Sequence, residues 1–354
     1  MASLPYWLIG ILAGLASALV YAAAASGTTT VILLAYMAPL PIFIAGLSRG
    51  TLTAVIAGAM GLLVMAFFAG VPGAIVFFAI AALAPIWLVR LALLSRMADT
   101  GGASAEVRAS RAREAHHRAV ERGTRDGPLE EQQSAPGIEW YPAGMLVVWT
   151  TAIAAVILVL SIVSVIGEDG GIRGTIVQMV NASLVDTEEL TAMLEARGIQ
   201  ISASAFLEAV AVVVPAMAAS VWVIMTLVNM LLAQSIVARS GMAIRPTPSI
   251  LDISYPQSSL IGFPVALALA FLPGELGFIG GSLAALLFVP YVLLGLVTIH
   301  AISRPWPART ALLILVYLSL LFIGWLVVLV GILGLVDAWL GLRQRYSGGS
   351  QRPT

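Results

Sequence analysis

Three polar side chains inside long apolar stretches are the residues of this sequence best suited to bind a small molecule: Glu208, Asn229 and His300. Ionisable groups within a membrane span are costly, and they are usually paired or functional. Glu208 lies about one turn into its stretch, where it either contacts interfacial water or faces an outward cavity. Asn229 is deeper in the same stretch, which favours hydrogen bonding between helices. His300 lies near the end of its stretch, where snorkelling toward water is the ordinary explanation.

The other ionisable residues of the apolar stretches lie near predicted span ends or turns. Arg90, Glu275 and Asp337 are of this kind. No acidic residue falls convincingly at the middle of a span, which disfavours a proton-driven transporter with its own carboxylate relay.

The sequence predicts no catalytic residue, metal site or cofactor. The segment Gly46–Gly50 reads GLSRG and matches G-x-S-x-G, but a nucleophile elbow needs a strand before its serine, and Ser48 lies in a predicted turn between two apolar helices. All 18 basic residues are arginine, so there is no lysine for a P-loop or an imine. With no cysteine, thiolate chemistry, disulfides and cysteine metal sites are excluded, and three scattered histidines are too few for a histidine cage. No nucleic-acid partner is expected.

Composition determines the class of fold. Hydrophobic residues make up 60% of the 354 and charged residues only 10%, whereas a soluble domain has about a quarter charged. A helix needs about 20 apolar residues to cross a bilayer. We therefore expect an all-α polytopic transmembrane helix bundle in contact with lipid, with about nine spans and with eight or ten as alternatives. The expected spans are 6–25, 30–48, 51–69, 73–95, 144–167, 205–238, 258–273, 278–302 and 310–341.

These spans define four parts of the chain. A first bundle of four spans occupies 1–96, a polar arginine-rich loop 97–142, a second bundle of about five spans 143–342, and a polar tail 343–354. The second bundle contains an external amphipathic segment, 168–204.

The arginines predict the orientation, because cytoplasmic loops of membrane proteins are enriched in basic residues. A cytoplasmic 97–142 loop places the N-terminus inside, and Arg173 and Arg197 are then outside. The arginines predicted inside are Arg49, Arg90, Arg96, Arg108, Arg111, Arg113, Arg118, Arg122, Arg125, Arg239, Arg245, Arg304 and Arg309. Arg343, Arg345 and Arg352 conflict with this rule, because nine spans put the tail outside.

The two polar segments have different expected roles. In the loop, a charged helix around Ala103–Arg122 is expected to be a solvated linker, with contact to anionic lipid or a cytoplasmic partner as the alternative. In the external segment, Asp186 and Glu189 form a capping-box-like start of a short helix that Gly198 ends. Leu190, Met193 and Leu194 would form its apolar face.

Small residues recur at spacings of four on two spans, which lets helix backbones approach closely. These residues are Gly10, Gly14, Ala18, Gly50, Ala54 and Gly58. The simpler interpretation is packing inside the bundle. The alternative is a docking surface for a second membrane protein.

Several short strings in a particular order resemble a known family over nearly the full length. They are APLPIFIAGL at 38–47, PIWLVR at 85–90, EWYPAG at 139–144, RPTP at 245–248, GLVTIH at 295–300 and GLVDAW at 334–339. Together they resemble the YybS-like family of bacterial inner-membrane proteins. The resemblance implies a cytoplasmic-membrane location and a fold similar to the substrate-binding membrane subunits of energy-coupling-factor vitamin transporters. It implies no particular activity, and this chain has more spans and larger polar insertions than those subunits.

The sequence therefore favours a transport-related membrane protein that binds a small molecule and depends on a partner, such as a separate energising ATPase. The alternative is a non-transporting scaffold that recruits other membrane proteins.

Overall fold

The computed structural model describes residues 4–23, 34–97, 138–165, 174–175, 177–178, 187–199, 201–249 and 253–343. The chain forms two compact units. The first consists of 1–143 with 229–248, and the second of 144–228 with 249–354.

Five apolar helical segments of the described residues have the length and composition to cross a membrane. They are α1 (Tyr6–Ala23), the stretch Thr51–Ala92, α7 (Ala143–Val163), α10 (Ala203–Arg239) and α12 (Gly274–Ile302). Three further apolar helices, Ser258–Leu269, Arg309–Phe322 and Leu326–Leu340, are shorter than a full span. These segments confirm an all-α membrane protein, while the number of nine spans is not confirmed.

The stretch Thr51–Ala92 of the first unit is two helical arms, divided at Gly70. It contains α4 (Thr51–Phe77), the π-helical η2 (Phe78–Ala82) and α5 (Leu83–Ala92). Gly70 has φ 70° and ψ −179° inside α4, a conformation that glycine adopts readily. A Cβ added at Gly58 would lie 2.5 Å from Ile86 Cδ1, yet in a straight helix these residues would be about 42 Å apart. The chain therefore reverses near Gly70, as the boundary between the two predicted spans requires.

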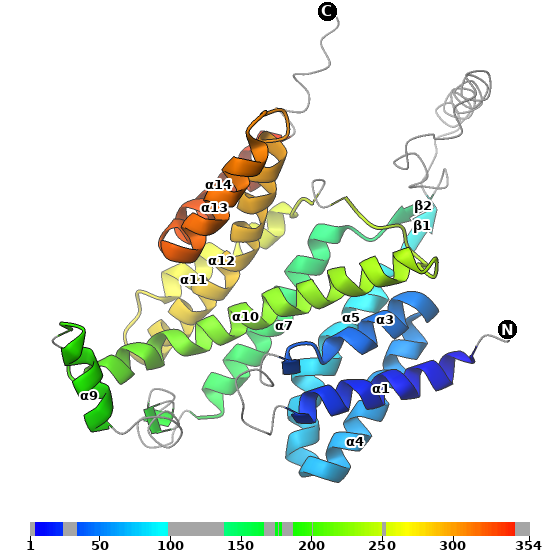
Figure 1. Cartoon of the computed structure of the whole chain (residues 1–354), viewed down its shortest axis with the longest axis horizontal. Coiled ribbons are helices and arrows are strands. Elements are labelled where there is room, and N and C mark those ends of the chain that lie inside the picture. The colour runs from blue at the N-terminus through cyan, green and yellow to red at the C-terminus, as the bar shows by residue number, and fades with distance from the viewer. Residues whose placement is uncertain are drawn as a thin grey trace, which may run out of the picture. The chain divides into compact units, whose positions relative to one another are not determined.

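The first unit gathers α1, α3 (Pro39–Arg49), α4 and α5 side by side (Figure 1). Its buried side chains include Phe43, Leu47, Phe77 and Leu88. The π-helical turn and the short α3 were not predicted.

A two-stranded antiparallel ribbon closes the base of the arginine-rich loop. Strands β1 (Ser95–Met97) and β2 (Ile138–Trp140) pair with Arg96 opposite Glu139, and the two side chains form an ion pair of 2.7 Å. This exposed pair contributes at most about 1 kcal/mol, so backbone pairing defines the register. The predicted helix at 103–122 and the arginines of the loop lie outside the described residues.

The core of the second unit is formed by α7, the first part of α10 and α12. Its members are Ala154, Leu158 and Ile162 of α7, Val223 of α10, and Phe278, Leu286 and Val289 of α12. The short helices η4 (Gln257–Leu260) and α11 (Gly262–Leu269) precede α12, and α13 (Arg309–Phe322) and α14 (Leu326–Leu340) follow it.

The prediction of one span over 310–341 is wrong, because the chain forms two helices there. Ile323, after α13, has φ −121° and ψ 79°, which ends the helix before Gly324. The apolar composition continues through this break, so hydropathy does not reveal it. None of the α13 residues is buried, whereas α14 buries Val330, Gly331, Gly334 and Asp337.

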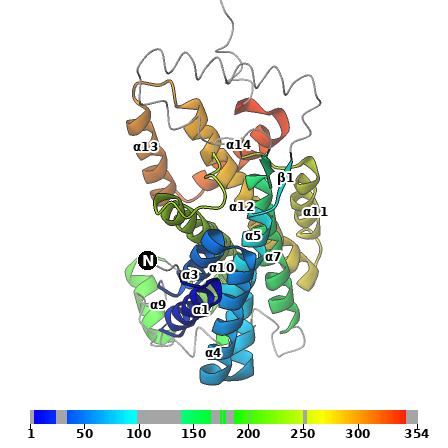
Figure 2. The ribbon, with the colours of Figure 1, turned by 90° about the vertical axis from the view of Figure 1, so that its right-hand side faces the viewer.

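Helices α12 and α14 lie side by side in both views of the molecule (Figures 1 and 2). A Cβ on Gly295 would overlap the Val330 carbonyl, and one on Gly334 would overlap the Tyr291 carbonyl. Only glycine permits this approach, since any side chain would collide with backbone atoms.

A short helix in the segment 168–204 follows the prediction closely. Helix α9 spans Thr187–Ala196, and Gly198 after it has φ 74°. The Gly198 and Ile199 N–H groups donate to the Glu195 and Leu194 carbonyls at 2.9 Å, the two bonds of a Schellman motif. Leu194 is buried but Met193 is exposed, so the apolar face is narrower than predicted. The predicted cap Asp186 lies outside the described residues, as does most of 166–186.

Candidate functional site

A pocket of about 470 Å³ lies in the second unit between α10, the end of α11 and the first half of α12. We call it the serine pocket, after its one polar side chain. It is lined by Val212, Val213, Ala216, Ala270, Leu272, Gly274, Gly277, Phe278, Gly281, Ser282 and Ala285. Its volume falls within the range of about 300–1,000 Å³ that is usual for small-molecule sites.

The wall of the serine pocket depends on a tight turn between α11 and α12. Pro273 is extended and Gly274 has φ 72°, so α12 begins immediately after the turn. A Cβ on Gly277 would overlap the Leu272 carbonyl, and one on Gly280 would overlap the Ala270 amide nitrogen. These glycines allow α12 to approach the end of α11 and the turn that follows it.

Ser282 is the polar group of this pocket. The residue is 4% exposed, and its hydroxyl makes no hydrogen bond to any residue that the structure describes. Other serines of the apolar helices donate to a carbonyl four residues earlier, as Ser220 does to Ala216 at 2.7 Å. The hydroxyl is therefore available to a ligand with one hydrogen-bonding group in the pocket, and such a bond contributes about 0.5–1.5 kcal/mol.

The three residues predicted to bind a ligand lie in three different environments. Glu208 is exposed on α10, one turn before Val212, and it does not line the serine pocket. Asn229 is fully buried in the first unit. His300 lies near the end of α12 and lines a different pocket.

Asn229 has a clear structural contact. Its Nδ2 donates to the Tyr36 carbonyl at 2.7 Å. The Leu40 N–H donates to Met37 rather than to Tyr36, because the chain turns before α3. Asn229 therefore satisfies a backbone acceptor of a turn that is distant in sequence.

Arg245 forms a second polar junction in the first unit. Its Nη1 donates to the Ala92 carbonyl at 3.1 Å, at the last residue of α5, and its guanidinium lies 6.0 Å from the Trp140 ring centre. Gln234 Nε2 donates to the Arg245 carbonyl at 3.0 Å. Burial lowers the pKa of Arg245. A cation at a helix C-terminus complements its dipole, which explains a buried arginine that the sequence placed simply among cytoplasmic charges.

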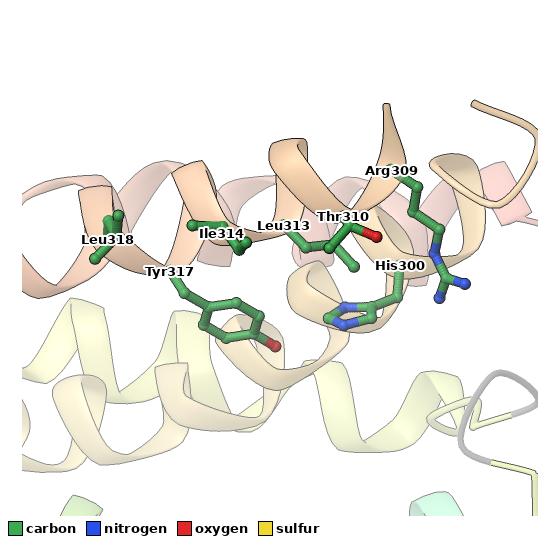
Figure 3. Close-up of a pocket in the computed structure, with 7 residues that line it drawn as sticks. All are labelled: His300, Arg309, Thr310, Leu313, Ile314, Tyr317 and Leu318. Atoms are coloured by element: carbon green, nitrogen blue, oxygen red, sulfur yellow. The ribbon is translucent and has the colours of Figure 1, made fainter. Parts of the chain in front are cut away.

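The pocket at His300 measures about 540 Å³, and we call it the α13 pocket. His300 comes from α12, and the other lining residues come from one side of α13 (Figure 3). These are Arg309, Thr310, Leu313, Ile314, Tyr317 and Leu318. Polar groups thus gather near the start of α13, and apolar groups follow along the helix.

A largely buried ion pair joins Asp337, in the last turn of α14, to Arg343, which follows the helix. Arg343 Nε lies 2.6 Å from Asp337 Oδ2, and the Arg343 N–H donates to Asp337 Oδ1 at 3.0 Å. Arg343 Nη2 also donates to the Ile253 carbonyl at 2.6 Å. Gly341 in the left-handed conformation turns the chain back so that these contacts form. The sequence signal was two opposite charges six residues apart across a glycine.

The small residues of the first unit face neighbouring helices of the same unit. A Cβ on Gly10 would lie 2.9 Å from Ile56 Cγ2, and one on Gly14 would overlap the Ala57 carbonyl. Ala18 and Ala54 are fully buried. Gly50, with φ 101°, instead occupies the turn between α3 and α4.

The first four residues of the G-x-S-x-G segment, Gly46–Arg49, are helical in the structure. Ser48 belongs to α3, and its hydroxyl donates to the Ile44 carbonyl at 2.7 Å. A strand–turn–helix elbow is therefore not formed there. In the described residues, no group of three or more histidine, cysteine or acidic side chains could hold a metal ion.

Comparison with known proteins identifies one family. The family model described as "Predicted membrane protein (DUF2232)" matches residues 139–338, which include α7, α10, both pockets and most of α14. No curated protein and no solved structure matches the chain. Because the match covers more than half of the sequence, this chain belongs to the DUF2232 family of predicted membrane proteins.

Proposed function

We propose that this protein is a transport-related protein of the bacterial cytoplasmic membrane that binds a small molecule in the serine pocket. The observation that supports the proposal is Ser282, a residue 4% exposed whose hydroxyl makes no hydrogen bond to the described residues, on the wall of a pocket of about 470 Å³. The ligand class that fits is a compact, mainly apolar molecule with one hydrogen-bonding group. Small apolar pockets with few polar groups are typical of ligand sites.

The energy for transport would come from a partner, such as a separate ATPase. The basis is the sequence: without lysine the chain has no P-loop, and no acidic residue falls convincingly at mid-span. The resemblance to YybS-like proteins, and through it to the substrate-binding subunits of energy-coupling-factor transporters, supports the same arrangement. A cytoplasmic N-terminus and 97–142 loop, and a chain with about nine spans, belong to this proposal.

The pocket can be tested by filling it. Ala285 is exposed on the pocket wall, so a phenylalanine there would enter the pocket without displacing the core. Ala268 on α11 is also exposed but does not line the pocket, and Ala268→Phe is the matched control. The intact protein would be purified in mild detergent, and small molecules and proteins that accompany it would be identified by mass spectrometry.

We expect wild type and Ala268→Phe to retain a stoichiometric small molecule and Ala285→Phe to lose it. Ser282→Ala should weaken retention about tenfold, as for one lost hydrogen bond. A molecule retained equally by Ala285→Phe would place the ligand elsewhere, for example near Glu208. Partners from another membrane process with no small molecule would favour a scaffold, although Gly10 and Gly14, which a scaffold was expected to use, pack against α4.

A further inference from the structure

We propose that the α13 pocket binds an anionic phospholipid, with Arg309 and His300 at the phosphate and the apolar side of α13 along an acyl chain. This site is separate from the serine pocket and does not depend on its function.

Arg309 carries a charge that no described residue neutralises. Its side chain makes no ion pair or hydrogen bond to the described residues, and its Nε is buried from solvent without a hydrogen-bond partner. The His300 side chain lies next to it, and the lining of the pocket contains no carboxylate (Figure 3). An arginine beside a histidine with no acidic residue is an arrangement that attracts an anion, and arginine binds phosphate through several parallel N–H donors.

The remaining polar groups near the start of α13 would add contacts to a bound phosphate. His300 Nδ1 donates to the Leu296 carbonyl at 2.9 Å, which orients the ring and leaves Nε2 without a hydrogen bond to the described residues. The Tyr317 ring packs edge-on to it with 5.9 Å between ring centres. Thr310 adds a hydroxyl donor next to Arg309.

The apolar part of the pocket indicates a lipid rather than a free anion. Leu313, Ile314 and Leu318 continue along α13 away from Arg309 (Figure 3), and none of the residues of α13 is buried. Charge at one end and an apolar wall along two turns match an amphiphile. Exposed Trp306 next to this end is typical of the membrane interface, and basic pockets between membrane helices bind anionic lipid headgroups.

Native mass spectrometry of the intact protein tests this proposal. The protein in detergent would be titrated with phosphatidylglycerol or with phosphatidylcholine of the same acyl chains. The variants are Arg309→Gln, Arg309→Lys, and the control Arg304→Gln, since Arg304 is exposed and does not line the pocket. We expect Arg309→Gln to weaken the tightest phosphatidylglycerol site about tenfold, Arg309→Lys to restore part of the affinity, and Arg304→Gln to match wild type.

Several results would overturn the proposal. Equal binding of both lipids would show that headgroup charge is irrelevant, and equal losses in Arg309→Gln and Arg304→Gln would indicate general surface attraction. Displacement of the lipid by millimolar inorganic phosphate would indicate a free-anion site. A change of oligomeric state in Arg309→Gln would mean that a second copy occupies the face. If Arg309→Gln does not fold, Ile314→Trp, which fills the apolar part, should lower lipid affinity by a similar factor.

Discussion

Two arginines of the second unit are used in opposite ways. Arg343, whose side chain is 14% exposed, binds Asp337 and the Ile253 carbonyl, and both contacts lie within the chain. Arg309 is half-buried and makes no side-chain ion pair or hydrogen bond to described residues. Removing an interaction inside the chain should cost stability, whereas removing an unneutralised charge should cost binding. The difference between the two shows which arginine maintains the fold and which is available to a ligand.

The largest effect is expected at the buried pair. Asp337→Ala leaves Arg343 charged and largely buried, and losing one partner of a buried pair costs about 3–5 kcal/mol. The midpoint of unfolding in detergent, followed by tryptophan fluorescence, would measure the loss. Glu139→Ala, which breaks the exposed pair with Arg96, should cost at most about 1 kcal/mol. Similar losses in both variants would contradict the assignment of Arg343 to the fold.

The contact between α12 and α14, which brings Asp337 toward its position, should be next in sensitivity. Gly334→Ala places a methyl group on the Tyr291 carbonyl, and such overpacking costs about 1–3 kcal/mol. Gly324 has no atom within 4 Å of an added Cβ, so Gly324→Ala should leave the midpoint near that of wild type. If the two alanines behave alike, the close approach of the helices does not hold in the membrane.

The same comparison between a structural and a ligand-binding residue applies to Asn229, which the sequence predicts as a ligand-binding residue. Asn229→Ala leaves the Tyr36 carbonyl without its donor and should cost about 1–3 kcal/mol of stability. Retention of the small molecule should be unchanged. Ser235→Ala, at an exposed position on the same helix, serves as the control. If Asn229→Ala unfolds at the same midpoint as wild type but loses the small molecule, Asn229 is a ligand-binding residue after all.

The smallest effect on stability is expected at Arg309. In lipid-free detergent, the free energy of unfolding of Arg309→Gln should lie within about 0.5 kcal/mol of the wild-type value, as is usual for surface substitutions. A difference should emerge only when phosphatidylglycerol is added, which stabilises wild type but not the variant. Strong destabilisation without lipid would place Arg309 with Arg343 as a structural residue.

The sequence predicts where most helices lie and not which helices touch. Length and hydropathy locate α1, α7, α10 and α12, and turn chemistry locates the reversal at Gly70 and the end of α9 at Gly198. The break at Ile323 is missed, because α13, the break and α14 are equally apolar. Lateral pairing is missed for a related reason: lipid tails are as apolar as leucine, so hydrophobicity does not select partners.

The candidate sites were predicted less well than the helices. His300 was predicted to bind a ligand, and it lines a pocket. Its neighbours Arg309 and Tyr317, however, come from a helix that was predicted as part of one long span. Ser282 was overlooked because a serine in an apolar helix usually bonds its own backbone. Its place on the wall of a pocket beside the tight turn at Gly274 is revealed only by the three-dimensional structure.

The contact between Arg343 and the Ile253 carbonyl has a consequence for the order of assembly. The two groups are 90 residues apart, and Arg343 leaves the ribosome after every described helix has been made. The partners of the first unit's early helices, such as Gly14 and Ala57, are by contrast close in sequence and available early. During synthesis, the second unit therefore cannot form its contact between Arg343 and Ile253 until Arg343 has emerged from the ribosome.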